Sequence, residues 1–72
     1  MKKLLKDYEL NSDMQYYELI VDSFINGQRT QAIEQFKRMP KVYRKTMVKC
    51  IVGGHWARHL DKQYTLTLID NI

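Results

Sequence analysis

Apolar residues recur every three or four positions along most of the chain, which is the spacing of one face of an α-helix. The first strong run covers residues 14–25, where Glu18 and Asp22 fall on the narrow polar arc of the helical wheel. The wide apolar arc consists of Tyr16, Tyr17, Ile20, Val21, Phe24 and Ile25. An apolar arc of this width predicts a central helix with neighbours on two sides.

Boundary signals frame this run. Ser12 and Gln15 have the spacing of a capping box, and Asp13 puts a negative charge at the positive end of the helix dipole. Asn26 and Gly27 suit a left-handed C-terminal cap. We therefore expect the helix to lie between these two signals.

Two more helical runs follow. The second is predicted to begin at Thr30, whose hydroxyl can cap it, and to end at Pro40, which cannot continue a helix. The third spans about 40–52 and stops at Gly53 and Gly54. Their apolar faces are Ala32, Ile33, Phe36 and Met39 in the second, and Tyr43, Met47, Cys50 and Ile51 in the third.

The C-terminal part has a less regular pattern. Trp56, Leu60 and Tyr64 are spaced four residues apart, which favours a helix. Residues 64–69 alternate like a strand, but a lone strand has no pairing partner in a helical chain, so a helix is expected there as well. Thr65 is a candidate cap for its last turn. The residues expected to be buried in that turn are Leu66, Ile69 and Ile72.

These elements predict one all-α domain over residues 1–72, a compact bundle of four to five short helices. Residues 1–11 form either a short helix through Leu4, Leu5 and Tyr8 or a frayed arm. The residues expected to share one core are Tyr17, Ile20, Phe24, Ile33, Phe36, Met47 and Ile51. Because a chain of 72 residues buries only about 60% of its unfolded surface, we also expect a homodimer or larger assembly.

Composition narrows the function classes. The single cysteine allows no disulfide within the chain and suits a reducing cytoplasm. No apolar run is long enough for a signal peptide or a membrane span. Neither a phosphate loop nor a Ser/His/Asp set is visible, and so small a domain has little volume for an enclosed substrate pocket. We expect no enzyme activity, cofactor, small-molecule substrate or membrane partner.

Charge is distributed unevenly. Six of the eight acidic residues lie between Asp7 and Glu34, where only Arg29 opposes them. Six of the twelve basic residues lie between Lys37 and Lys49, with no acid among them. Two valines fall near these lysines on the wheel. The candidate binding surface is therefore Lys37, Arg38, Lys41, Arg44, Lys45, Val48, Lys49 and Val52.

Three interpretations of the basic helix 37–49 remain open: contact with nucleic-acid phosphates, contact with an acidic protein or a second copy of the chain, and a face exposed only to solvent. A helix-turn-helix motif is not expected, because neither Gly27 nor Gly54 has apolar residues on both sides. If Arg29, Arg38 and Arg58 lie on the same face as the lysines, nucleic-acid binding is favoured. If they are scattered over the surface, a protein partner is favoured.

His55 and His59 are spaced so that one helix could present both imidazoles to a metal ion. Cys50 and Asp61 would have to complete the ligand set, and Cys50 belongs to the apolar face of the preceding helix. We therefore expect no metal site, two ordinary histidines beside Trp56, and a cysteine that packs in the core.

Gly27, Ala32, Phe36, Met39, Pro40 and Arg44 form the run G-x4-A-x3-F-x2-M-P-x3-R. This run resembles a pattern in small, uncharacterised accessory proteins of bacterial phages and mobile elements. The resemblance implies a short accessory protein and assigns no activity or site residues. The sequence as a whole favours a non-enzymatic interaction module that binds a protein partner or itself, with nucleic-acid binding through the basic helix as the alternative.

Overall fold

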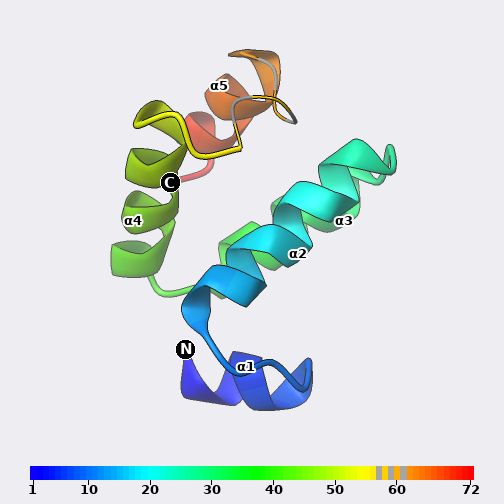
Figure 1. Ribbon diagram of the computed structural model, residues 1–72, viewed down its shortest axis with the longest axis vertical. Coiled ribbons are helices and arrows are strands. Elements are labelled where there is room, and N and C mark those ends of the chain that lie inside the picture. The colour runs from blue at the N-terminus through cyan, green and yellow to red at the C-terminus, as the bar shows by residue number, and fades with distance from the viewer. Residues whose placement is uncertain (57, 59, 61) are drawn as a thin grey trace.

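The computed structural model describes residues 1–56, 58, 60 and 62–72, and these residues form helices without any strand. The helices are α1 (Lys2–Asp7), α2 (Asp13–Ile25), α3 (Arg29–Arg38), α4 (Lys41–Val52) and α5 (Lys62–Asp70) (Figure 1). The predicted all-α bundle is confirmed, and the N-terminal segment contains a short helix. Within the described residues, no helix is both long enough and apolar enough to cross a lipid bilayer.

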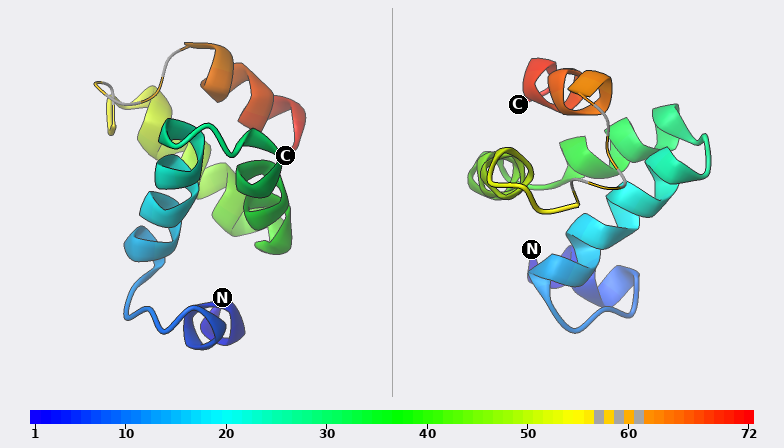
Figure 2. Two further views of the ribbon diagram at one scale, coloured as in Figure 1. Left: turned by 90° about the vertical axis from the view of Figure 1, so that its right-hand side faces the viewer. Right: turned by 45° about the horizontal axis from the view of Figure 1, so that its top comes forward.

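Helices α2 and α3 lie side by side as a hairpin, and α5 packs on α4. Helices α1 and α5 lie at opposite ends of the molecule (Figures 1 and 2). At the α1 end, the ring of Tyr8 meets the ring of Tyr16 edge-on, with 5.5 Å between the centroids. At the α5 end, Tyr64 stacks on Phe24 of α2, with 4.8 Å between the centroids. Aromatic contacts therefore attach both terminal helices to α2.

Side-chain and backbone caps hold the start and end of α2. The Ser12 hydroxyl accepts a hydrogen bond from the Gln15 amide at 3.3 Å. The Gln15 side chain accepts one from the amide of Asn11, one residue earlier than a standard capping box requires. At the other end, Gly27 has φ of 78°, and the Gln28 amide donates to the Ser23 carbonyl at 2.8 Å. Both predicted boundaries of α2 are confirmed.

The same closure ends α1 and α4. Gly54 has φ of 98°, and the His55 amide donates to the Cys50 carbonyl at 3.0 Å. At the end of α1 the equivalent position is Glu9, with φ of 56°, and the Leu10 amide donates to the Leu5 carbonyl at 2.8 Å. Glutamate carries a Cβ atom that makes this left-handed conformation unfavourable. The turn after α1 is therefore strained in a way that the other two are not.

Three expectations were wrong. Helix α3 begins at Arg29 after Gln28, so Thr30 lies in the first turn and does not cap it. Trp56 has a positive φ of 59° and lies in a turn, and the described residues Arg58 and Leu60 are not helical. Of the three residues expected to share a helix, only Tyr64 is in one, α5.

The third concerns the last turn expected after Thr65 and the face it buries. Thr65 lies inside α5 and does not cap a turn. Leu68 is fully buried there, whereas the side chains of Leu66 and Ile69 are 51% and 42% exposed. The helix is rotated so that Tyr64, Leu68 and Ile72 face the core. The stacking of Tyr64 on Phe24 fixes this rotation, because the two alternative faces have similar hydrophobicity.

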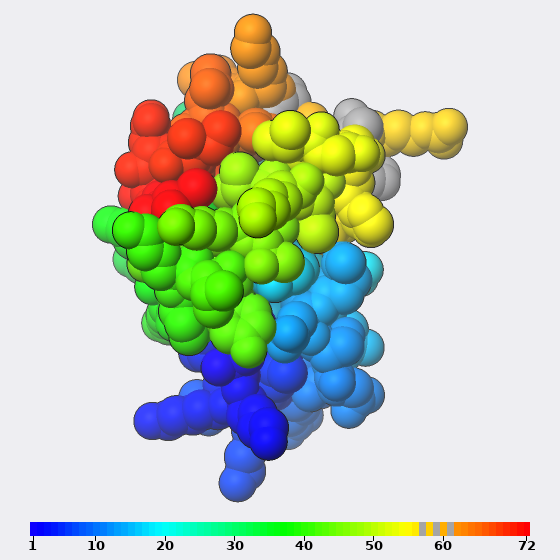
Figure 3. Space-filling view, turned by 90° about the vertical axis from the view of Figure 1, so that its left-hand side faces the viewer, coloured from blue at the N-terminus to red at the C-terminus, as the bar shows by residue number. Residues whose placement is uncertain are grey.

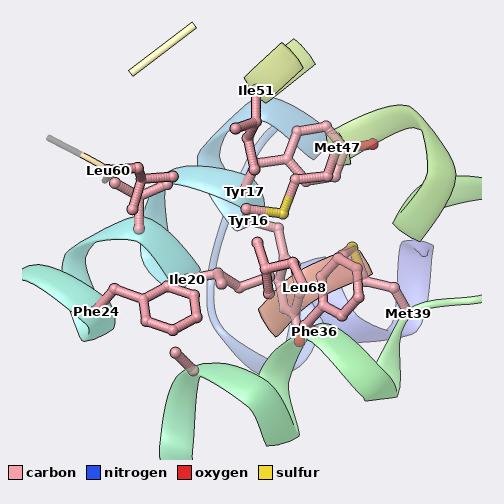
Figure 4. Packing of buried hydrophobic residues seen from close by; sticks show 12 residues of the cluster. Tyr16, Tyr17, Ile20, Phe24, Phe36, Met39, Met47, Ile51, Leu60 and Leu68 are labelled. Carbon is pink, nitrogen blue, oxygen red and sulfur yellow. The ribbon is translucent and has the colours of Figure 1, made fainter. Parts of the chain in front are cut away.

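The core collects apolar residues from α2, α3, α4 and α5, which point toward one another in Figure 4. Its buried members are Tyr16, Tyr17, Ile20, Val21, Phe24, Ala32, Phe36, Met39, Met47, Ile51, Leu60 and Leu68. Six of the seven predicted core residues are buried, and the seventh, Ile33, is half-buried and packs against the others. Because one face of α2 and one face of α4 pack into this core, the opposite faces of these two helices point to solvent.

Polar groups are also buried between α2 and α3. The Ser23 hydroxyl lies 2.9 Å from Oε1 of Gln35 and 3.1 Å from the Leu19 carbonyl oxygen. The Tyr16 hydroxyl donates to the Gln35 backbone carbonyl at 2.7 Å. That carbonyl belongs to the last turn of α3, where a helix leaves its carbonyls without partners. Tyr16 therefore caps α3 from the neighbouring helix.

Candidate interaction surfaces

Helix α4 carries a mixed basic and apolar face that points to solvent. At 3.6 residues per turn, Lys41, Val42, Lys45, Lys49 and Val52 fall within an arc of roughly 100°. All five are exposed, with Val42 at 64% and Val52 at 71%. Helix α4 forms much of the surface in Figure 3, from green to yellow-green. These five residues are called the α4 outer face below.

Four of the eight residues predicted from the sequence lie on this face: Lys41, Lys45, Lys49 and Val52. Two others from α4 turn inward. Val48 is half-buried and packs against the core. Arg44 is half-buried, and its Nε atom is buried with no hydrogen-bond partner among the described groups. Both lie beside Met47 and Ile51, whose burial sets the rotation of α4.

The remaining two predicted residues, Lys37 and Arg38, lie in the last turn of α3. Both are exposed, and a guanidinium nitrogen of Arg38 donates to the Tyr8 hydroxyl at 2.6 Å. Sequence reasoning missed Val42. The helical wheel could have identified it, because Val42 lies next to Lys49 at one edge of the arc of lysines, and Lys41 lies at the other edge.

The arginines scatter over the molecule. The guanidinium of Arg29 lies 5.2 Å from the centroid of the Tyr64 ring, at the start of α3. Arg38 lies at the other end of the same helix, beside α1. Arg58 is exposed in the segment between α4 and α5. Arg29 and Arg38 therefore lie apart at the two ends of α3, and none of these three arginines lies on α4.

A second surface feature lies on α2. Glu18, Val21, Asp22 and Ile25 line a shallow groove of about 250 Å³ together with Trp56. The two acids are exposed and lie one helical turn apart, and Ile25 is 50% exposed. This region, called the α2 groove below, combines an apolar floor with an acidic rim.

The turn after α4 positions Trp56 at the end of this groove. The indole ring meets the Tyr17 ring edge-on, with 6.5 Å between the centroids, and lies 4.9 Å from the His55 ring. Burial raises the pKa of Tyr17 to about 12, and the nearby Asp13 carboxylate acts in the same direction. The Tyr17 hydroxyl is therefore neutral at physiological pH, and the negative charge of the groove comes from Glu18 and Asp22.

Two larger open grooves, of about 460 and 510 Å³, flank the contact between Tyr8 and Arg38. Their linings mix charges of both signs, with Glu34 in one and Lys3 and Asp7 in the other. Burial raises the pKa of the adjoining Tyr16 to about 12, the neighbouring Tyr8 adds to the rise, and Arg38 opposes it. Among the described residues, neither lining contains a cysteine, serine or histidine.

The residues considered as metal ligands are His55, His59, Cys50 and Asp61. His59 and Asp61 lie outside the described residues. Among the residues that are described, no three His, Cys, Asp or Glu side chains are grouped to hold a metal ion. Cys50 is a free, half-buried cysteine on α4.

Comparison of the chain with protein-family models, with curated proteins and with solved structures finds no match. The surfaces of the molecule are therefore the basis for its proposed function.

Proposed function

We propose that the protein is a non-enzymatic interaction module that docks on another protein surface through the α4 outer face. The observation that supports this most directly is the exposure of Val42 and Val52, at 64% and 71%, among three lysines on one face. Lysines alone would suit a solvated helix. Two exposed apolar side chains, one at each end of a row of lysines, match the general composition of a docking site, in which apolar contacts exclude water and charges select the partner.

The chemistry of this face defines its partner. Lys41, Lys45 and Lys49 require negative charge opposite them, and the two valines require apolar contact on either side of Lys45 and Lys49. A protein surface with carboxylates and exposed aliphatic or aromatic side chains meets both needs. A phosphate backbone meets only the first, and it would leave the valines in water.

Nucleic-acid binding remains the second candidate function, supported by the one-turn spacing of the three lysines. In that case the lysines contact phosphates, and binding tracks the backbone without reading bases. The narrower proposal, an accessory protein of a bacterial phage or mobile element acting in the cytoplasm, is supported by the residues from Gly27 to Arg44 and by the single cysteine.

Photo-crosslinking in bacterial cells that express the chain separates the two functions. A photoreactive amino acid replaces exposed Thr46 beside the α4 outer face, and the same probe at exposed Gln31 of α3 is the control. We expect a protease-sensitive adduct from position 46 and none from position 31. The variant Lys45→Glu with Lys49→Glu should abolish it. The variant Lys2→Glu with Lys6→Glu, with the same charge change and spacing on α1, should not.

A nuclease-sensitive adduct would instead support the alternative function. A gel shift at two salt concentrations would then show a log–log slope of about −0.9 per duplex phosphate contacted. Absence of any adduct from position 46 would contradict both functions of this face.

A further inference from the structure

The α2 groove and the α4 outer face match each other in charge, in apolar content and in spacing. On α2, Glu18, Asp22 and Ile25 follow one another at intervals of four and three residues and all point to solvent. On α4, Lys45, Lys49 and Val52 have the same intervals and the same exposure. Each acid of the first set therefore has a base in the second, and the apolar ends coincide. Both sets span about 10 Å of helix.

The match also holds in the opposite direction along α4. Val42, Lys45 and Lys49 lie at intervals of three and four residues, which is the reverse of the α2 order. An antiparallel helix therefore also places one lysine opposite each acid of the α2 groove, with Lys45 and Lys49 exchanged relative to the parallel arrangement. The α4 outer face presents an apolar residue at each end and lysines between them, so one of the two valines meets Ile25 in either direction.

We infer that the partner of the α4 outer face is a second copy of this chain, which presents its α2 groove. This inference rests on the proposed function and names its partner. In the complex, Lys45 and Lys49 pair with Asp22 and Glu18, and a valine packs on Ile25 and the indole of Trp56. An ammonium group beside that indole gains a further cation–π attraction.

The inferred complex is a two-fold dimer in which the contact forms twice. Because groove and face lie on different helices of one chain, each copy supplies one of each. A stable interface buries about 800 Å² per partner. That is about one sixth of the 4844 Å² surface of this molecule, more than one helix face alone provides. Two symmetric contacts are therefore expected in the dimer.

Charge reversal tests the pairing by sedimentation equilibrium of the full chain at micromolar concentration in low salt. The face variant carries Lys45→Glu and Lys49→Glu, and the groove variant carries Glu18→Lys and Asp22→Lys. We expect the wild type to dimerise and each variant alone to dimerise at least about a hundredfold more weakly, because like charges then meet at both contacts. Circular dichroism confirms that each variant stays helical.

Mixing the two variants provides the decisive measurement. One contact of the heterodimer then joins the acidic face of the face variant to the basic groove of the groove variant, and the other contact keeps the wild-type pairing. Opposite charges therefore meet at both contacts, and a one-to-one mixture should form a heterodimer of near wild-type affinity. Matched controls change the same charges elsewhere on the exposed surface. These are Lys2→Glu with Lys6→Glu, and Glu34→Lys with Asp70→Lys, and both should dimerise like the wild type.

A wild type that stays monomeric, or a variant mixture that does not associate, would overturn the inference. The crosslink from position 46 then shows whether the proposed function also fails. An adduct with the mass of two chains supports the inference. An adduct with a different protein overturns it and leaves the proposed function standing, and no adduct removes both.

Discussion

Replacement of Tyr16 by phenylalanine removes one oxygen atom and should destabilise the protein by about 2 kcal/mol. The Tyr16 hydroxyl donates to the Gln35 carbonyl at 2.7 Å, and both residues are buried, with 0% and 3% of their surface exposed. That carbonyl receives no hydrogen bond from the Met39 amide, which donates to Phe36 instead. Phenylalanine would therefore leave a buried carbonyl without its partner, and such a loss costs about 1–3 kcal/mol.

Thermal and urea denaturation followed by circular dichroism would measure this loss. For a domain of this size, about 2 kcal/mol corresponds to a fall in Tm of about 10 °C. The control is Tyr17→Phe, at a neighbouring position that is 3% exposed and whose hydroxyl donates to no described group. We expect it to change the unfolding free energy by less than about 0.5 kcal/mol. Equal effects of the two substitutions would refute the role of Tyr16 as the cap of α3.

Three further outcomes are expected. Phe36→Ala should cost about 3–5 kcal/mol, because the ring is fully buried and leaves a cavity, and a loss below about 2 kcal/mol in urea denaturation would contradict this packing. Glu9→Gly should stabilise the protein by about 1 kcal/mol, because Glu9 has φ of 56°, whereas Glu9→Ala, which keeps the Cβ atom, should give no such gain. Stability should fall as pH rises from about 10 to about 12, because Tyr16 and Tyr17 have a pKa of about 12 when folded and about 10 when unfolded. A urea midpoint that does not change over this alkaline range would contradict that reasoning.

The sequence predicts α2 and α4 well because their boundaries are encoded locally. Ser12 and Gln15 begin α2, and Gly27 and Gly54 end α2 and α4, each through groups only a few residues apart. The core follows from the same periodicity. Local signals fail where two options have similar local energies. Thr30 is a good cap residue, yet the N-cap of α3 is Gln28, two residues earlier, and no side chain caps the start of this helix.

The candidate surfaces divide in the same way. The lysines of α4 follow directly from their spacing, since a one-turn repeat opposite Met47 and Ile51 must face solvent. The inward positions of Arg44 and Val48 depend on how closely α4 packs against the other helices. The spacing of apolar residues does not specify this distance. The α2 groove was not predicted at all. It exists only because the turn after Gly54 brings Trp56 back beside Val21 and Ile25, a contact between segments about thirty residues apart.

The placement of Trp56 also makes the intrinsic fluorescence of the protein sensitive to the state of the α2 groove. It is the only tryptophan in the chain, so indole emission arises from a single place, the end of the α2 groove. Its half-buried ring rests against Tyr17 and His55, where solvent reaches part of it. Anything that covers the groove displaces that solvent and shifts the emission to shorter wavelength, whereas unfolding exposes the ring and shifts it to longer wavelength. Docking and denaturation thus shift the tryptophan emission maximum in opposite directions. A quencher dissolved in the buffer distinguishes a covered groove from an open one.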